Sequence, residues 1–203
     1  MKLYYSKGAC SLAVRIALHE IGISSEFEAV NLRTKQTETG EDFLKINPKG
    51  AVPTLLLDNQ EVLTENAVIQ QYLADHYQAT KLLPPVGDLK RYRALEWLNF
   101  VTTELHKGCA PLFNPQLPAE LKDSIFKPAL KNKLNFVDQQ LGHQKYLLGE
   151  NFTLADGYLY VILFWLPNFK FELSEWGNLS RYFNELTARK AIQQALREEG
   201  LAN

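Results

Sequence analysis

Residues 47–66, which read NPKGAVPTLLLDNQEVLTEN, contain the clearest local signals in this chain. The segment 47–50 is rich in residues that interrupt regular structure, and the apolar run 52–57 follows it. A short polar turn then leads into 61–64, which is the spacing of two strands joined by a tight turn. The stretch therefore predicts a strand pair that follows a sharp turn.

On both sides of this strand pair, short strand-like and helix-like segments alternate up to residue 80. The predicted elements are a strand at 2–5, a helix at 11–21, a strand at 27–32, a helix at 41–46, the strands at 52–57 and 61–64, and a helix at 65–77. Their order is βαβαββα, which predicts an α/β domain over residues 1–80.

Beyond residue 80 the pattern changes to the helical period. The segment 81–88 contains two prolines and a glycine, which end helices and predict a linker. Helices are then predicted at 92–105, 121–141, 154–166, 179–187 and 191–199. We therefore expect an all-α domain at 89–203.

Composition limits the classes of function. The 22 basic and 23 acidic residues give a net charge of -1 and are scattered, which argues against nucleic acid as a partner. The most apolar stretch, 158–166, is far shorter than the roughly 20 residues that cross a bilayer. Cys10 and Cys109 fit neither a disulfide framework nor a metal site. The sequence predicts a cytoplasmic protein with no metal and no membrane association.

Gly8-Ala9-Cys10-Ser11 lies between the first strand and the first helix. Unpaired N–H groups and the positive end of the helix dipole stabilise an anion at such a position. A thiol there can have a pKa well below its usual value of about 8.5. Two interpretations stay open: Cys10 is a reactive thiol, or Cys10 is an inert small residue and Ser11 caps the helix.

Two further segments suggest recognition of a peptide. A cis bond at Val52-Pro53 would turn the backbone of Val52 outward to pair with an extended peptide, although only about 5 to 6% of X–Pro bonds are cis. Thr64-Glu65-Asn66 opens a helix and could grip an α-amino acid, with Glu65 on the ammonium group. The alternatives are a trans proline in a loop and a capping cluster.

Taken together and in this order, these three features resemble the thioredoxin-like domain of the glutathione transferases, and in detail the bacterial beta class. The matching stretches are 1–5, 8–12, 47–53, 63–66, 71–74, 96–100 and 103–108, and the resemblance extends over nearly the whole chain. It implies the architecture of cytosolic glutathione transferases, in which an all-α C-terminal domain follows the thioredoxin-like one. It also implies a homodimer that uses glutathione as a co-substrate and has no tightly bound cofactor.

The resemblance further implies a set of glutathione contacts. Val52 would pair its backbone with the cysteinyl part, and Lys35 would meet the glycyl carboxylate. Glu65 and Asn66 would hold the γ-glutamyl end, although family members often have Ser or Gly at the position of Asn66. The remaining contacts, some of them across a dimer interface, would come from Asn99, Thr103, Glu104, Leu105 and His106.

Three residues are predicted to be catalytic by this resemblance: Cys10, Ser11 and His106. His106 would lie near the thiol of Cys10 or of glutathione, where it could donate a hydrogen bond to a thiolate or accept a proton near neutral pH. Structural roles are expected for Pro53 and for Thr153 and Asp156, which have capping-box spacing. Cys109 is expected to be a buried thiol.

The activity implied is conjugation of the glutathione thiolate to small hydrophobic electrophiles, bound between the domains near Leu112, Phe113 and Trp165. Thiol–disulfide exchange through Cys10 is a second activity at the same site. The alternatives are a glutathione-dependent reductase or dehalogenase that requires Cys10, and a non-enzymatic binding protein of the same fold. A glutathione-dependent isomerase of the zeta type is disfavoured because Gly8-Ala9-Cys10-Ser11 replaces its usual serine-rich start.

Overall fold

The structure is a computed structural model that describes residues 1–202, and it consists of two units. Unit 1 contains residues 1–80 together with 188–202, and unit 2 contains residues 81–187. The last stretch of the chain thus belongs to the same unit as the first.

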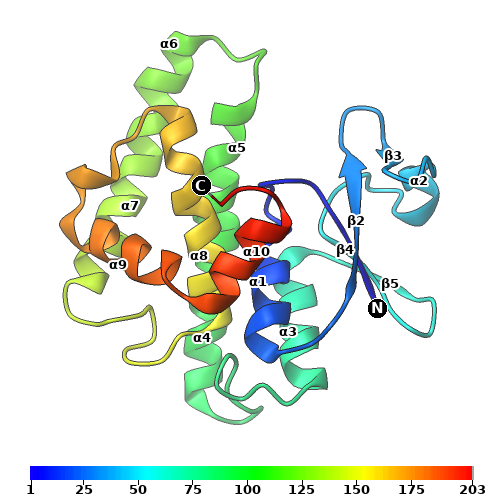
Figure 1. The fold of residues 1–203 in the computed structure, drawn as a ribbon. Helices are drawn as coiled ribbons and strands as arrows, with labels where there is room; N and C mark the ends of the chain where they lie inside the picture. The colour runs from blue at the N-terminus through cyan, green and yellow to red at the C-terminus, as the bar shows by residue number, and fades with distance from the viewer. Residues whose placement is uncertain (203) are drawn as a thin grey trace. The chain divides into compact units, whose positions relative to one another are not determined.

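Unit 1 is built on a five-stranded mixed sheet with the order β3-β2-β1-β4-β5 (Figure 1). The central strand β1 runs parallel to β2, and the other neighbouring pairs are antiparallel. The strands are β1 (Lys2–Tyr5), β2 (Glu26–Asn31), β3 (Gln36–Thr37), β4 (Thr54–Leu56) and β5 (Val62–Thr64). The predicted order βαβαββα is observed with one addition, the two-residue strand β3.

Alternating side chains give the sheet of unit 1 two apolar faces. Leu3 and Leu55 pack with α1 (Leu12–Ile21) and α3 (Asn66–His76) in one buried cluster. Tyr4 points to the opposite face and packs near α2 (Phe43–Ile46). The helices therefore hold the sheet from both sides, and the segments between strands and helices carry the predicted site residues.

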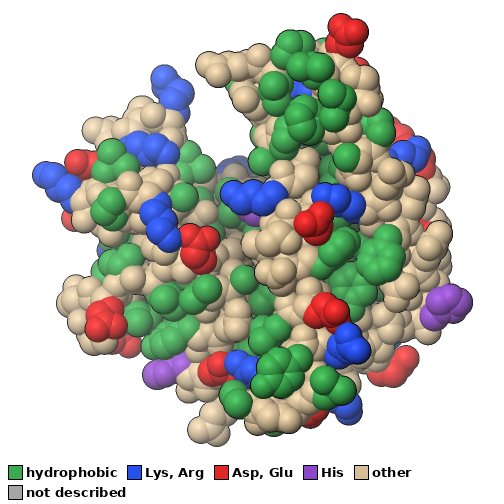
Figure 2. Space-filling model, turned by 180° about the vertical axis from the view of Figure 1, so that it is seen from behind, with side chains coloured by type: hydrophobic (Ala, Val, Ile, Leu, Met, Phe, Trp, Pro, Cys, Tyr) green, Lys and Arg blue, Asp and Glu red, His purple; other side chains and the backbone are tan. Residues whose placement is uncertain are grey.

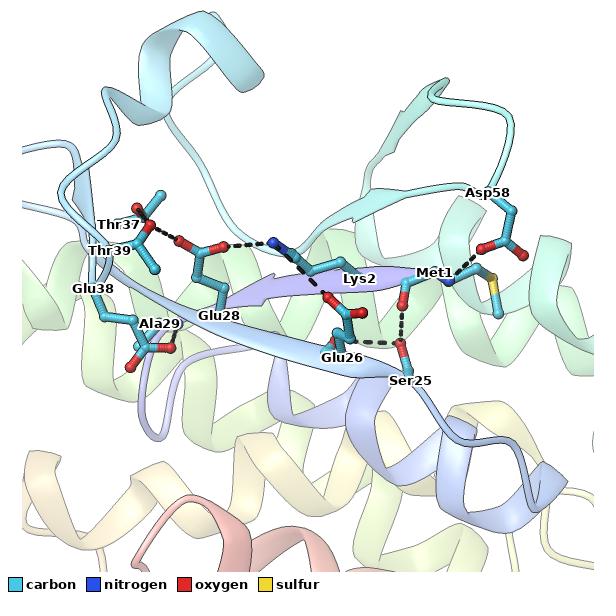
Figure 3. Close-up of polar contacts among 10 residues, drawn as sticks. All are labelled: Met1, Lys2, Ser25, Glu26, Glu28, Ala29, Thr37, Glu38, Thr39 and Asp58. Atoms are coloured by element: carbon cyan, nitrogen blue, oxygen red, sulfur yellow. Dashed lines mark hydrogen bonds and ion pairs between the residues drawn. The ribbon is translucent and has the colours of Figure 1, made fainter.

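A polar network ties the first strand to its neighbours (Figure 3). Lys2 donates to the buried carboxylate of Glu28 at 3.0 Å, and Thr39 donates to the other oxygen of the same group. Burial alone would raise the pKa of Glu28, but these hydrogen bonds outweigh it and lower the pKa. The amino group of Met1 pairs with Asp58 in the turn between β4 and β5.

The C-terminal helix α10 (Lys190–Glu198) packs against α1 in unit 1. Its apolar face, which includes Ile192 and Ala195, is fully buried. The sequence placed this helix in the all-α domain at 89–203, so the division into units differs from the predicted one at this end. Helical periodicity indicates that one face is buried, but it does not indicate which element covers that face.

Unit 2 is all-helical, as predicted. Its segments are α4 (Leu89–Phe100), η1 (Val101–His106), α5 (Lys107–Phe113), α6 (Ala119–Leu121), η2 (Lys122–Phe126), α7 (Lys127–Leu141), α8 (Leu154–Trp165), η3 (Leu166–Phe169), η4 (Leu173–Glu175) and α9 (Gly177–Thr187). Helix α8 is buried along almost its whole length, because it is apolar on all sides. The predicted linker is part of this unit: Leu82 and Leu83 are buried, and the Leu82 carbonyl accepts from Leu154 N at 3.2 Å.

The start of α8 is fixed by the predicted capping box of Thr153 and Asp156. The fully buried Asp156 carboxylate accepts from Thr153 N and Oγ1, each at 2.7 Å. It also accepts from Leu147 N at 2.9 Å and from the Tyr182 hydroxyl at 2.7 Å. One side chain therefore joins the loop before α8, the helix itself and α9.

Charged side chains are mixed over the surface. Figure 2 shows basic and acidic groups interspersed on one face, with patches of hydrophobic side chains between them. Among residues 1–202, no helix is both long and apolar enough to span a membrane.

Candidate functional site

The loop that carries Cys10 is held by its own hydrogen bonds. Ser11 is fully buried, and its hydroxyl donates to the Ser6 carbonyl at 3.3 Å and accepts from Ser6 N at 3.2 Å. Gly8 has φ +67°, in the left-handed region that glycine adopts without strain. The burial and internal bonding of Ser11 favour a role in shaping the loop over direct contact with a reacting sulfur.

Cys10 faces the turn before β4. Its thiol donates to the Val52 carbonyl at 3.3 Å, and the Val52-Pro53 bond is cis, which is one of the two alternatives left open by the sequence. The Gly50 carbonyl, in the same turn, accepts from Lys35 Nζ at 2.7 Å. The structure thus brings the predicted residues Cys10, Val52 and Lys35 to one side of unit 1.

Asn66 joins the helix α3 to the Cys10 loop. Its side-chain amide donates to the Cys10 carbonyl at 2.6 Å and accepts from Gln70 Nε2 at 2.6 Å. Asn66 is 6% exposed and Gln70 is fully buried. The side chain of Asn66 is therefore engaged within the protein, which leaves its backbone as the group able to meet a ligand. Gln70 was not singled out from the sequence, because no local pattern marks a polar helix residue as buried.

Glu65 lies at the N-terminal end of α3 in an unusual backbone conformation, with φ +72°. Its exposed carboxylate pairs with Lys49 Nζ at 2.6 Å, and Lys49 also donates to the Thr64 hydroxyl at 3.0 Å. An ammonium group of a ligand would have to share or replace this contact. Lys49 is a second residue that the sequence analysis did not single out.

The predicted site residues of unit 2 lie on one continuous helical segment. Asn99 is near the end of α4, and residues 103–106 fall within η1, which has π-helical hydrogen bonding. Stretches of π-helix are frequent at functional sites. Leu105 is fully buried, and the Glu104 carboxylate pairs with Lys133 at 2.7 Å.

His106 is held by aromatic neighbours. Its Nδ1 is 2.6 Å from the Tyr158 hydroxyl, and its ring centroid is 5.2 Å from that of Trp165. Burial, aided by the positive charge of Lys107, lowers the pKa of His106 to about 4. The imidazole is therefore neutral at pH 7 and a weak base, and of its two predicted roles the low pKa favours donation of a hydrogen bond to a thiolate. Tyr158 was missed because an apolar helix predicts core residues.

An aromatic cluster continues from His106. Phe113 packs edge-on against Trp165, with centroids 5.2 Å apart, and against Phe169, with centroids 4.6 Å apart. Leu112 and Trp165 are buried, whereas Phe113 is 49% exposed. Of the three residues expected to meet an apolar substrate, Phe113 offers the most accessible surface.

The second cysteine has the opposite environment to Cys10. Cys109 is fully buried in α5, and burial raises the pKa of its thiol to about 12. This confirms the prediction of a buried thiol, and it leaves Cys10 as the more accessible of the two sulfur atoms.

Both parts of the chain match known family models. Residues 8–76 match the family described as the glutathione S-transferase N-terminal domain, and residues 100–190 match the C-terminal domain. The chain is 42% identical to the glutathione S-transferase GstA of Escherichia coli O157:H7, over 99% of this chain and 100% of that protein.

Solved structures of other proteins share the fold of this chain over its full length. A sphingomonad glutathione S-transferase complexed with glutathione is 43% identical with a TM-score of 0.94, and the match covers all of both chains. A beta-class glutathione S-transferase from Sphingomonas chungbukensis is 42% identical with a TM-score of 0.95, again over all of both chains. The chain therefore belongs to the glutathione S-transferase family, and within that family it is similar to the bacterial beta class.

Proposed function

We propose that this glutathione transferase binds glutathione beside the Cys10 loop and conjugates its thiolate to small hydrophobic electrophiles. The observation that carries the proposal is the meeting of three segments at Cys10. The Cys10 thiol contacts the Val52 carbonyl, and the Cys10 backbone carbonyl accepts from the side-chain amide of Asn66. Two of these segments, at Val52 and at the start of α3, are those from which recognition of a peptide was predicted, and the sphingomonad relative of the same fold is complexed with glutathione.

The proposed contacts follow the chemistry of each group. The Val52 backbone pairs with the cysteinyl part of glutathione, as an added strand would. Glu65 receives the ammonium of the γ-glutamyl end in place of Lys49, and the backbone of Asn66 at the start of α3 receives its carboxylate. Lys35, whose ammonium now donates to the Gly50 carbonyl, meets the glycyl carboxylate.

In the proposed reaction the nucleophile belongs to glutathione. Its thiol loses a proton to water near the start of α1, where the helix end stabilises the thiolate, and the sulfur then attacks an electrophilic carbon and expels the leaving group. His106 donates a hydrogen bond to the sulfur, because a pKa of about 4 makes its neutral imidazole a weak base. In unit 2, the exposed ring of Phe113 offers apolar contact to the electrophile.

Thiol–disulfide exchange at Cys10 is the second proposed activity, and it is favoured by the partial exposure of this thiol. The Cys10 thiolate attacks the glutathione sulfur of a mixed disulfide, which releases the other thiol and leaves a Cys10–glutathione disulfide. A second glutathione thiolate then attacks this bond, which releases oxidised glutathione and restores Cys10.

We also propose a cytoplasmic homodimer. Leu89, Tyr92 and Phe136 in unit 2 expose large apolar side chains, which is the kind of surface that a second copy would cover. Sedimentation equilibrium should give twice the mass of the chain, and a monomer would contradict this part of the proposal.

The test of the function is retention on immobilised glutathione, followed by assays with aryl halides, epoxides and mixed disulfides. Wild type should be retained and should conjugate. Cys10→Ala should lose disulfide exchange and keep conjugation within about tenfold, because the attacking sulfur belongs to glutathione. Cys109→Ala is the control and should keep both activities.

Each contrary outcome has a distinct meaning. Loss of all conjugation in Cys10→Ala would favour the reductase or dehalogenase. Failure of the wild type to bind glutathione would exclude the proposed function and favour a non-enzymatic binding protein. His106→Ala should retain binding and lower the rate, because the hydrogen bond acts on the reacting sulfur.

A further inference from the structure

The C-terminal end of the chain makes direct contact with the loop that carries Cys10. Glu199, which follows α10, accepts a hydrogen bond from Gly8 N at 2.8 Å through one carboxylate oxygen. Its other oxygen accepts from Arg15 Nε in α1 at 3.1 Å. Gly8 and Glu199 are 191 positions apart in the sequence, so the carboxylate joins two distant parts of unit 1.

Arg15 orients this carboxylate and is itself held on several sides. Its side chain is 2% exposed and also pairs with Glu198 at 3.0 Å. Its guanidinium carbon lies 3.7 Å from the ring centroid of Phe27 and 4.3 Å from that of Tyr5. Arg15 can therefore change position little without disturbing the sheet, which makes it a rigid support for Glu199.

Apolar contact supports the same arrangement. A Cβ atom built on Gly8 would lie 3.8 Å from a methyl group of Leu201, so the end of the chain lies against the loop. At the other end of α10, Arg189 makes two contacts of 2.8 Å with the carboxylate of Glu20, near the end of α1. Helix α10 is thus fixed at both ends on unit 1.

Burial gives the Glu199 contact its importance. The carboxylate has no exposed surface, and burial raises the pKa of Glu199 by more than the Gly8 N–H and Arg15 lower it. Isolated buried charges are costly, and removal of one member of a buried pair leaves the other without compensation. The Glu199 carboxylate is therefore stable only where both the Gly8 amide and Arg15 reach it, which fixes these three groups relative to one another.

We propose that Glu199 is a positioning residue for the glutathione site: it fixes the Gly8 amide and thereby sets the position of Cys10, two residues further along. The inference rests on the proposed function, because Cys10 and Val52 are the groups that would meet the cysteinyl part of glutathione. The α10 segment, distant in sequence from every predicted glutathione contact in unit 1, is then part of what shapes the site.

The experiment measures two quantities in the full-length protein. The first is amide hydrogen exchange at Gly8 and Cys10 in the absence of glutathione, and the second is the KM and kcat for glutathione. Glu199→Ala should accelerate exchange at Gly8 by about tenfold, the loss expected for one hydrogen bond to a charged acceptor. It should raise KM for glutathione by a similar factor and change kcat less.

The matched control is Glu198→Ala, because Glu198 is the adjacent residue and also pairs with Arg15 but does not contact the loop. It should leave exchange at Gly8 and KM close to the wild-type values. Glu199→Gln, which keeps one oxygen able to accept from Gly8, should recover part of both losses and serves as the test if the alanine variant does not fold.

Equal exchange rates and equal KM in the Glu199 and Glu198 variants would overturn the inference. Faster exchange with an unchanged KM would also overturn it, since the loop would then be anchored without any effect on glutathione. If the wild type fails to bind glutathione, the proposed function falls, and with it the positioning role, whereas the exchange data still decide whether Glu199 anchors the loop.

Discussion

At the scale of single residues, the two cysteines show how burial decides reactivity. Cys10 is partly exposed, whereas Cys109 is fully buried and the pKa of its thiol is raised to about 12. A rise of about three pKa units lowers the thiolate fraction near pH 7.5 by roughly a thousandfold. We expect one thiol to react rapidly with an aromatic disulfide reagent in the native protein, and two after unfolding in urea.

A matched pair of variants identifies the reactive thiol. Cys10→Ala should remove the rapid phase, and Cys109→Ala should leave it unchanged. Two rapid phases in the native wild type would show that α5 opens readily, contrary to the burial of Cys109.

His106 should make folding stability depend on pH. The pKa of its imidazole is about 4 in the folded protein, against about 6.5 in an unfolded chain. Between these values the unfolded chain binds the extra proton, so stability is fully present above pH 6.5 and is lost as the pH falls toward 4. The loss should reach about 2 to 3 kcal/mol, measured by urea unfolding across this range. His106→Gln should unfold with a shallower pH dependence, and an unchanged slope would contradict the burial of the ring.

At the scale of elements, Asp156 joins three parts of unit 2 through hydrogen bonds from Thr153, Leu147 and Tyr182. Asp156→Ala leaves these buried donors without an acceptor. We expect a loss of about 3 to 5 kcal/mol in the free energy of unfolding, since each unsatisfied buried donor costs about 1 to 3 kcal/mol. Asp123→Ala, at an exposed carboxylate in η2, is the control and should leave the free energy of unfolding close to the wild-type value. A similar loss in both variants would refute the special role of Asp156.

The elements also show what a sequence can and cannot predict. The strands and helices of unit 1 were predicted because their apolar residues repeat with a period of two or near 3.6. Strand β3 has two residues, too few for any period, and the π-helical hydrogen bonds of η1 leave no mark on the pattern. The cis bond at Val52-Pro53 was one of two alternatives, because a proline between a turn and a strand can adopt either isomer.

The candidate site divides in the same way. Cys10, Val52 and Asn66 lie in motifs that are local in sequence, so they could be found without a structure. Tyr158, Glu199 and Gln70 act through single contacts with residues distant in sequence or through burial, which no local pattern records. For the same reason the protein-bound side chain of Asn66 could not be foreseen.

At the scale of the whole molecule, unit 1 is discontinuous in sequence. Its sheet and the helices α1 and α3 come from the first 80 residues, whereas α10 comes from the last sixteen. Pairing such distant segments has an entropic cost during folding, which burial of the helix must offset. Unit 1 is therefore completed only when the end of the chain has packed against α1.

This dependence predicts the effect of a cavity in α10. Ile192 is fully buried in unit 1, and Ile192→Ala should lower the free energy of unfolding by about 2 to 4 kcal/mol. Because α10 covers α1, amide exchange should accelerate in α1 as well as in α10, although the two helices are far apart in sequence. Ile125→Ala, at an exposed position of η2 in unit 2, is the control and should change neither quantity by much. If exchange in α1 stayed at the wild-type rate while α10 opened, α10 would be a separable appendage, and its contact with Gly8 could not hold the Cys10 loop.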